Sequence, residues 1–229
     1  MKEKEIRELE EIDETLLRRI LNAHSKTPLE ALYLELGCLP LRYIIKARRI
    51  NYLRYLANLK EDELLYEFYK AQVNFPGKGD WITTVLNDIE DIGLNINIEN
   101  LRGVKKVAFK KRVKKHIYDA AFKYLLLKAV PTNHSKMKNL LYDKFKMQSY
   151  FKNGNLSKCE AQHYFKFRTR MEDFADNFKK GSVDISCRLC SQSDYNDSEK
   201  YPDSQKHFLN CNVMIKDCLL YTSPSPRDS

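Results

Sequence analysis

The chain has 229 residues, of which 43% are hydrophobic and 11% aromatic, so it is apolar enough to fold around a core rather than remain disordered. Charged residues make up 31%, and only seven glycines and seven prolines occur, which favours helices over strands and turns. The sequence lacks an apolar run of about 18 residues, which argues against a membrane span. Its first residues, Met-Lys-Glu-Lys-Glu, do not resemble a signal peptide.

Six cysteines without a secretion signal indicate reduced thiols and an intracellular location, in nucleus or cytoplasm. The net charge of +9 is unevenly distributed. Residues 102–150 contain fourteen Lys or Arg against two Asp, whereas the first thirty residues contain six basic and eight acidic side chains. A local excess of this size predicts a polyanionic partner such as nucleic acid, and nothing indicates a small-molecule substrate.

The first forty residues predict two helices. Residues 5–23 carry apolar side chains three and four positions apart, which predicts an amphipathic helix that packs through them. Thr27 is expected to cap a short second helix, with Pro28 in its first position and Gly37 at its end. The apolar side of the first helix consists of Ile6, Leu9, Ile12, Leu16, Ile20 and Ala23.

A third helix is predicted from Pro40 to about Leu59. It carries five cations and no acid, with tyrosines between them, and such a face is suited to phosphates or bases. A solvated basic face is the other interpretation. In a later helix that contains Trp81, the spaced acids Asp88 and Asp91 are expected on a solvated face.

Residues 104–130 give the longest helical pattern in the rest of the chain. Lysines at i, i+4 spacing repel one another in an isolated helix, and a phosphate partner explains that repulsion better than fold stability does. A solvated face is the other interpretation of these lysines. After Pro131 a short helix is expected over residues 135–147, and Ser157 with Glu160 predicts a capping box. The predicted nucleic-acid contacts are Arg42, Lys46, Arg49, Lys106, Lys110, Lys111, Lys114, Lys115, Arg168 and Arg170.

A metal site is predicted near the end of the chain. Cys187 and Cys190 are separated by two residues, and His207 and Cys211 stand at i, i+4, which places both on one face of a helix. This Cys3His set matches a structural, tetrahedral zinc site without an open coordination position. Unrelated thiols beside a histidine are the other interpretation.

Residues 218–228 resemble the conceptual translation of a transposase mosaic-end sequencing adapter. We therefore exclude Cys218 from the zinc ligands, expect a disordered tail over residues 218–229, and expect the reading frame to be truncated. A native tail rich in Ser and Pro is the other interpretation.

The sequence also resembles the region downstream of the reverse-transcriptase domain in invertebrate non-LTR retrotransposon polyproteins. The resemblance covers about residues 12–211 and includes a terminal zinc motif formed by the Cys3His set. The chain lacks the Tyr/Phe-x-Asp-Asp turn that holds magnesium in a polymerase, so the resemblance implies a noncatalytic part of an RNA-directed DNA polymerase. The runs that carry it are Leu21–Glu30, Leu34–Gly37, Pro40–Arg49, Lys78–Trp81 and Phe167–Met171.

Together these patterns predict a mostly α protein, a multi-helix array followed by a small Cys3His zinc module. We expect a thumb-like helical region over residues 1–100, a basic helical region over 101–182 and a zinc-knuckle-like module over 183–217. The expected function is noncatalytic binding of RNA or DNA. A zinc-stabilised helical module for protein–protein interaction is the alternative, and the sequence does not indicate an oligomeric state.

Overall fold

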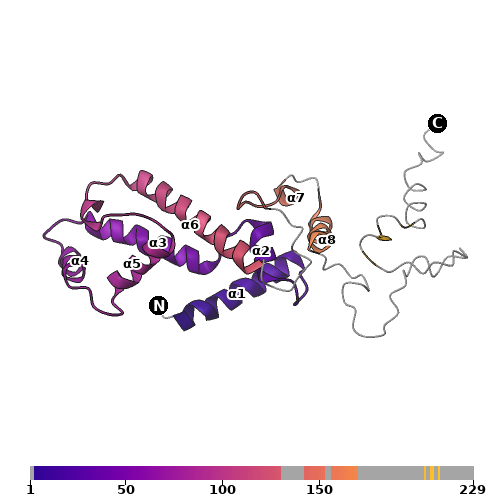
Figure 1. Cartoon of the computed structure of the whole chain (residues 1–229), viewed down its shortest axis with the longest axis horizontal. Coiled ribbons are helices and arrows are strands. Elements are labelled where there is room, and N and C mark those ends of the chain that lie inside the picture. Colours follow the sequence, from indigo (N-terminus) through magenta and orange to yellow (C-terminus); the bar gives the residue numbers. More distant parts are fainter. Residues whose placement is uncertain are drawn as a thin grey trace, which may run out of the picture. The chain divides into compact units, whose positions relative to one another are not determined.

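A computed structural model describes residues 3–129, 142–152 and 156–169, together with Ser204, His207, Phe208 and Cys211. These residues are mostly helical and include no strand, which confirms the mostly α part of the predicted fold (Figure 1). None of the described helices is long and apolar enough to cross a lipid bilayer. The helices are α1 (Glu3–Leu21), α2 (Leu29–Leu36), α3 (Leu41–Ala57), α4 (Leu64–Asn74), α5 (Trp81–Asp91), the 3-10 turn η1 (Ile98–Leu101), α6 (Lys106–Ala129), α7 (Ser149–Lys152) and α8 (Lys158–Arg168).

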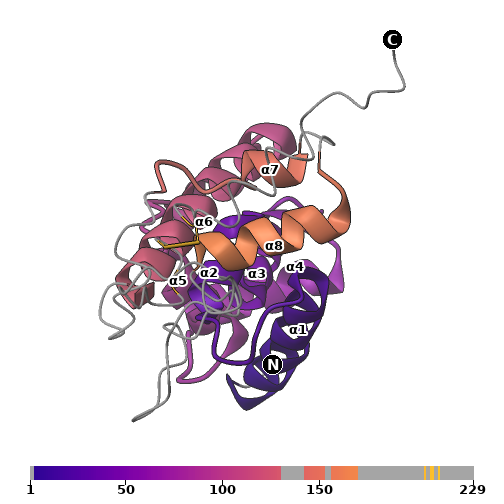
Figure 2. The same ribbon diagram turned by 90° about the vertical axis from the view of Figure 1, so that its right-hand side faces the viewer.

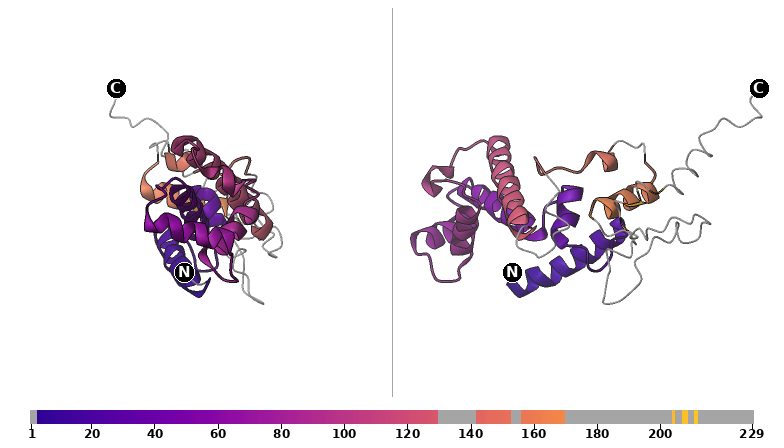
Figure 3. Two further views of the ribbon diagram at one scale, coloured as in Figure 1. Left: turned by 90° about the vertical axis from the view of Figure 1, so that its left-hand side faces the viewer. Right: turned by 45° about the vertical axis from the view of Figure 1, so that its right-hand side comes forward.

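The chain divides into two compact units, Met1–Asn155 and Leu156–Ser229. Helix α3 is the centre of the first unit and packs against α1, α4, α5 and α6. Ile50 and Leu53 of α3 are fully buried in the main core, which also contains buried residues of α5 and α6. In Figures 1 and 3, α6 lies along one side of α3 and α1 along the other.

Helix α6 belongs to the same core as the helices before it. Its apolar residues recur every fourth position, which forms a stripe that follows the helix and packs against α2 and α3. The expected regions 1–100 and 101–182 therefore share one hydrophobic core, which extends along α6 to Tyr124. The buried stripe consists of Phe109, Val113, Ile117, Ala121 and Leu125.

Local signals at helix ends predicted some caps correctly and one incorrectly. Gly37 ends α2 in the left-handed conformation, and Ser157 and Glu160 form the predicted reciprocal capping box of α8. The predicted Thr27 cap is wrong, because α2 starts after Pro28 and the buried Thr27 hydroxyl has no hydrogen-bond partner among the described residues.

The apolar side predicted for α1 is largely exposed. Leu9, Ile12, Leu16 and Ile20 are 42–67% exposed, whereas Leu17 and Leu21 are buried. The apolar arc of this helix is wider than its contact with α2 and α3, so only one edge of the arc enters the core. Ile6 is the member of the predicted set that this edge buries.

Residues 142–152, which we call the strap, differ from the predicted helix. Tyr142–Gln148 are not helical, and only the short α7 follows them, while residues 135–141 lie outside the described part of the chain. The strap is fixed by tertiary contacts instead, because its backbone passes over the end of α2 at Gly37. In Figure 2 the strap leads past α6 into α7. A Cβ atom at Gly37 would overlap the backbone of Lys146 and Met147.

This close approach predicts a difference between two glycines with the same backbone conformation. Gly37 has φ 60° and Gly93 has φ 63°, but no atom lies within 4 Å of a Cβ built on Gly93. Gly93→Ala should therefore lower the free energy of unfolding by about 1–2 kcal/mol through backbone strain alone. Gly37→Ala should lower it by a further ~1–3 kcal/mol, because the strap must move. Urea denaturation of both variants checks this, and equal losses would contradict the strap contact.

Candidate nucleic-acid interface

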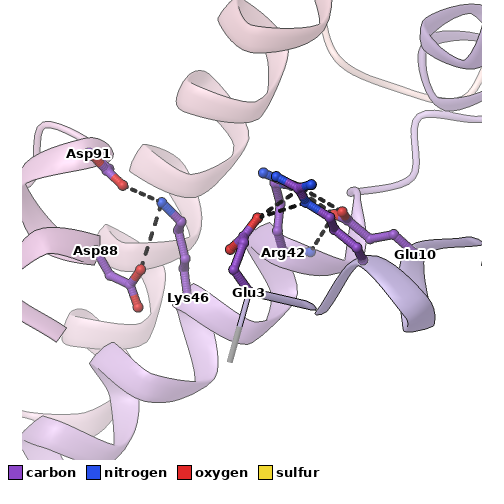
Figure 4. Close-up of polar contacts among 7 residues, drawn as sticks. Glu3, Glu10, Arg42, Lys46, Asp88 and Asp91 are labelled. Carbon is purple, nitrogen blue, oxygen red and sulfur yellow. Dashed lines mark hydrogen bonds and ion pairs between the residues drawn. The ribbon is translucent and has the colours of Figure 1, made fainter. Parts of the chain in front are cut away.

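The structure separates the predicted cations of α3 from those of α6. Arg42, in the first turn of α3, forms a two-pronged ion pair with Glu10 of α1, with atom pairs at 2.6 and 2.8 Å (Figure 4). The Glu10 carboxylate also accepts the backbone N–H of Arg42 at 3.3 Å. Because Pro40 provides no side-chain cap, Glu10 serves as a cap supplied by another helix and complements the positive end of α3.

Lys46 and Arg49, further along the same face of α3, are paired with α5. Lys46 Nζ lies 2.5 Å from Asp91 and 3.7 Å from Asp88, and Arg49 Nη1 lies 3.2 Å from Asp88 (Figure 4 shows the Lys46 pairs). The interpretation of Asp88 as solvated is therefore wrong, since its side chain is only 8% exposed. Burial raises the pKa of Asp88, and the hydrogen bond from Arg49 and the charge of Lys46 oppose that rise. Because the cost of burying Asp88 offsets the attraction to its two cations, we infer that these ion pairs orient α3 against α5 and add little net stability.

The last turn of α3 holds the segment that leads into α6. The Arg54 guanidinium donates to the Val104 carbonyl at 2.8 and 2.5 Å. Asn58 donates to the Leu101 carbonyl and accepts the N–H of Gly103. Four of the five cations of α3 thus have internal partners, and Arg48 is the exposed one.

The predicted lysines of α6 are exposed, unlike the paired cations of α3. Within the described part of the chain, none of them has an ion-pair partner; Lys114 instead lies 5.5 Å from the centre of the Tyr118 ring. Asp119 is the only acid of α6. We call the set Lys106, Lys110, Lys111, Lys114 and Lys115 the lysine face.

Two further lysines near this face were not singled out from the sequence. Phe145 of the strap contacts Tyr118 and Phe122 of α6, with ring centres 5.6 and 6.0 Å apart. Its exposed neighbours Lys144 and Lys146 are thereby brought to α6. Their positive charge was visible in the sequence, but their place beside α6 depends on a contact more than twenty residues away.

The second unit contains the remaining predicted residues that the structure describes. Arg168 lies in the last turn of α8, and Arg170 lies outside the described residues. Of the four predicted zinc ligands, His207 and the buried Cys211 are described, while Cys187 and Cys190 are not. The described residues contain no group of three or more metal-binding side chains, and they include only half of the predicted ligand set.

Comparisons of the chain with protein-family models, curated proteins and solved structures find no match. The functional interpretation therefore depends on the distribution of paired and unpaired charge.

Two arginines of α3 offer a direct check of that distribution. Arg42→Met should lower the free energy of unfolding by about 1–3 kcal/mol, because it keeps the aliphatic stem but leaves the Glu10 carboxylate, 13% exposed, without its guanidinium. Arg48→Met, on the exposed side of the same helix, should change it by less than about 0.5 kcal/mol. Urea denaturation measures both, and similar losses would contradict the assignment of Arg42 as a structural residue.

Proposed function

We propose that this chain binds nucleic acid through the lysine face of α6, as a noncatalytic module. The observation that carries the proposal is the contrast between the two basic helices. The cations of α3 are mostly neutralised by acids of α1 and α5, whereas the lysine face has no such acids among the described residues. Five unneutralised lysines on one helix repel one another, and a line of phosphates is the partner that relieves this repulsion.

The resemblance to the post-polymerase region of non-LTR retrotransposon proteins fits this activity. In that setting the chain would grip the template or target nucleic acid, and catalysis would reside in a polymerase domain elsewhere in a longer protein. We accordingly include Arg168 and Arg170 as further contacts from the second unit. We omit Arg42, Lys46 and Arg49 from the proposed interface, because their internal partners would have to be displaced first.

A protein-interaction module remains the second candidate, favoured by exposed apolar side chains on two helices. Leu64, Phe68 and Phe75 are 60–83% exposed and follow one side of α4 and its end. The exposed apolar side chains of α1 described above form a second such surface. Capture of a protein partner that survives nuclease treatment would support this candidate, and loss of the partner with the nucleic acid would argue against it.

The nucleic-acid proposal predicts steep salt dependence that depends on particular lysines. Changing Lys110, Lys111, Lys114 and Lys115 to Gln should reduce the slope of log K against log salt for a DNA duplex by up to about 3.6, at about 0.9 for each phosphate that the variant no longer neutralises. Fluorescence anisotropy with a labelled 25-base-pair duplex measures the slope.

The matched control removes the same charge from exposed lysines on other elements. Lys4, Lys26, Lys70 and Lys78 lie on α1, α4 and two loops, and their change to Gln should leave the slope nearly unchanged. No binding by the unaltered chain at low salt, or an equal reduction of the slope in both variants, would contradict the proposal.

We propose in addition that Cys187, Cys190, His207 and Cys211 hold one structural zinc ion. Two features of the described ligands fit such a site. His207 lies in a helical turn whose Phe208 carbonyl accepts the N–H of Cys211, and the Cys211 side chain is shielded from solvent as zinc-bound thiolates commonly are. The imidazole and thiolate donors are those that zinc prefers.

Metal analysis of the purified chain tests the zinc proposal. We expect about one zinc ion per chain, and its loss in Cys211→Ser because three ligands bind zinc far more weakly than four. Cys159→Ser, at an exposed cysteine of α8, should keep the metal. A Cys211→Ser protein that retains the full zinc content would rule out this ligand set.

A further inference from the structure

The strap is held by a buried carboxylate. Glu35 of α2 is 0% exposed, and its two carboxylate oxygens accept hydrogen bonds from the Tyr142 hydroxyl at 2.6 Å and the Tyr150 hydroxyl at 2.7 Å. Its backbone carbonyl accepts the N–H of Gln148 at 3.0 Å. A single residue thus holds the first residue of the strap and two residues in its second half.

The strap is also tied to α6 on the side of the lysine face. Lys111, Lys115, Tyr118 and Phe122 follow one another at steps of four, three and four, so they share one face of α6. Phe145 packs on the last two of these residues. On this face of α6 the lysines are followed by the aromatic residues that Phe145 contacts. The strap therefore brings Lys144 and Lys146 close to the C-terminal end of the row of lysines.

We propose that the strap extends the lysine face, so that Lys144 and Lys146 contact the phosphates of the bound nucleic acid, and that Glu35 is the positioning residue for this extension. The inference rests on the proposed function. Residues 142–152 carry three lysines and one acid, Asp143, so the strap adds positive charge to that of α6.

Burying a carboxylate costs free energy, because its charge must be desolvated. Apolar contacts would hold the strap without that cost. The carboxylate makes directed bonds, however, and two short hydroxyl–carboxylate bonds fix the position of the backbone better than apolar packing does. Gly37 has no side chain, which leaves room for the backbone of the strap against the end of α2. Glu35, which holds the strap, lies only two residues before Gly37.

The test uses the full chain and a labelled 25-base-pair DNA duplex, with affinity measured as a function of salt. Lys144→Gln with Lys146→Gln should lower the slope of log K against log salt by about 1.8 and the affinity at about 0.1 M salt by about tenfold or more. Lys70→Gln with Lys78→Gln removes the same charge from α4 and the loop after it, and should leave the slope unchanged. All four lysines are exposed, so these variants should fold normally.

The positioning role of Glu35 is tested by non-additivity. Glu35→Gln, or Tyr142→Phe with Tyr150→Phe, should lower the slope by a similar amount, and should have no further effect when Lys144 and Lys146 are already Gln. Circular dichroism and urea denaturation show whether each variant is folded. If Glu35→Gln does not fold, the double variant Tyr142→Phe, Tyr150→Phe provides the test.

The outcomes separate the two proposals. If the unaltered chain does not bind the duplex, both proposals fail. If the lysine-face variant has a reduced slope while the Lys144 and Lys146 variant does not, the strap proposal is overturned and the function stands. If the strap lysines matter but folded Glu35 and tyrosine variants keep the full slope, the positioning role of Glu35 is overturned.

Discussion

The ion pairs of helix α3 with its neighbours are the interactions on which the rest of the first unit depends. Arg42 meets Glu10 of α1, and Lys46 and Arg49 meet Asp88 and Asp91 of α5. These pairs lie on one face of α3 and set how α1 and α5 approach it. With α3 oriented by these ion pairs, its apolar side chains point into the core that it shares with α6.

The pairing also decides which positive charge is available to a partner. A guanidinium or ammonium group that is already hydrogen-bonded to a carboxylate gains little from a phosphate, because the existing partner must be displaced first. The lysine face of α6 meets no such competition among the described residues, so its repulsion is relieved only by solvent, counterions or a bound polyanion. Two helices that look equally basic in the sequence therefore differ in how much of their positive charge the described acids neutralise.

Much of the fold could be predicted from the sequence, because helix positions depend on local patterns. The apolar stripe of α6, Gly37 at the end of α2 and the Ser157 capping box are all signals within a few residues. The charge pairs depend on residues 32 to 45 positions apart, so the pattern of α3 alone gave no partner. We predicted Arg42, Lys46 and Arg49 as nucleic-acid contacts. Their alignment on one face of α3, and the two acids three positions apart on α5, were the features that could have indicated internal pairs.

The conformation of the strap also depends on a contact between residues far apart in the sequence, which local patterns could not predict. Residues around Tyr142 have a composition that suits a helix, but Glu35, 107 residues away, holds them in another conformation. No local pattern contains that interaction. The place of Lys144 and Lys146 beside α6 follows from it, which is why the lysine face could be predicted and its extension could not.

Lysine reactivity in the presence of nucleic acid tests the division between structural and ligand-binding cations most directly. The chain would be acetylated briefly with and without a saturating DNA duplex, and each lysine quantified by mass spectrometry. We expect the duplex to protect Lys110, Lys111, Lys114 and Lys115. Lys46 should react slowly in both samples, and Lys70 and Lys78 should react equally in both. Unchanged reactivity of the α6 lysines in a chain that has bound the duplex would contradict it.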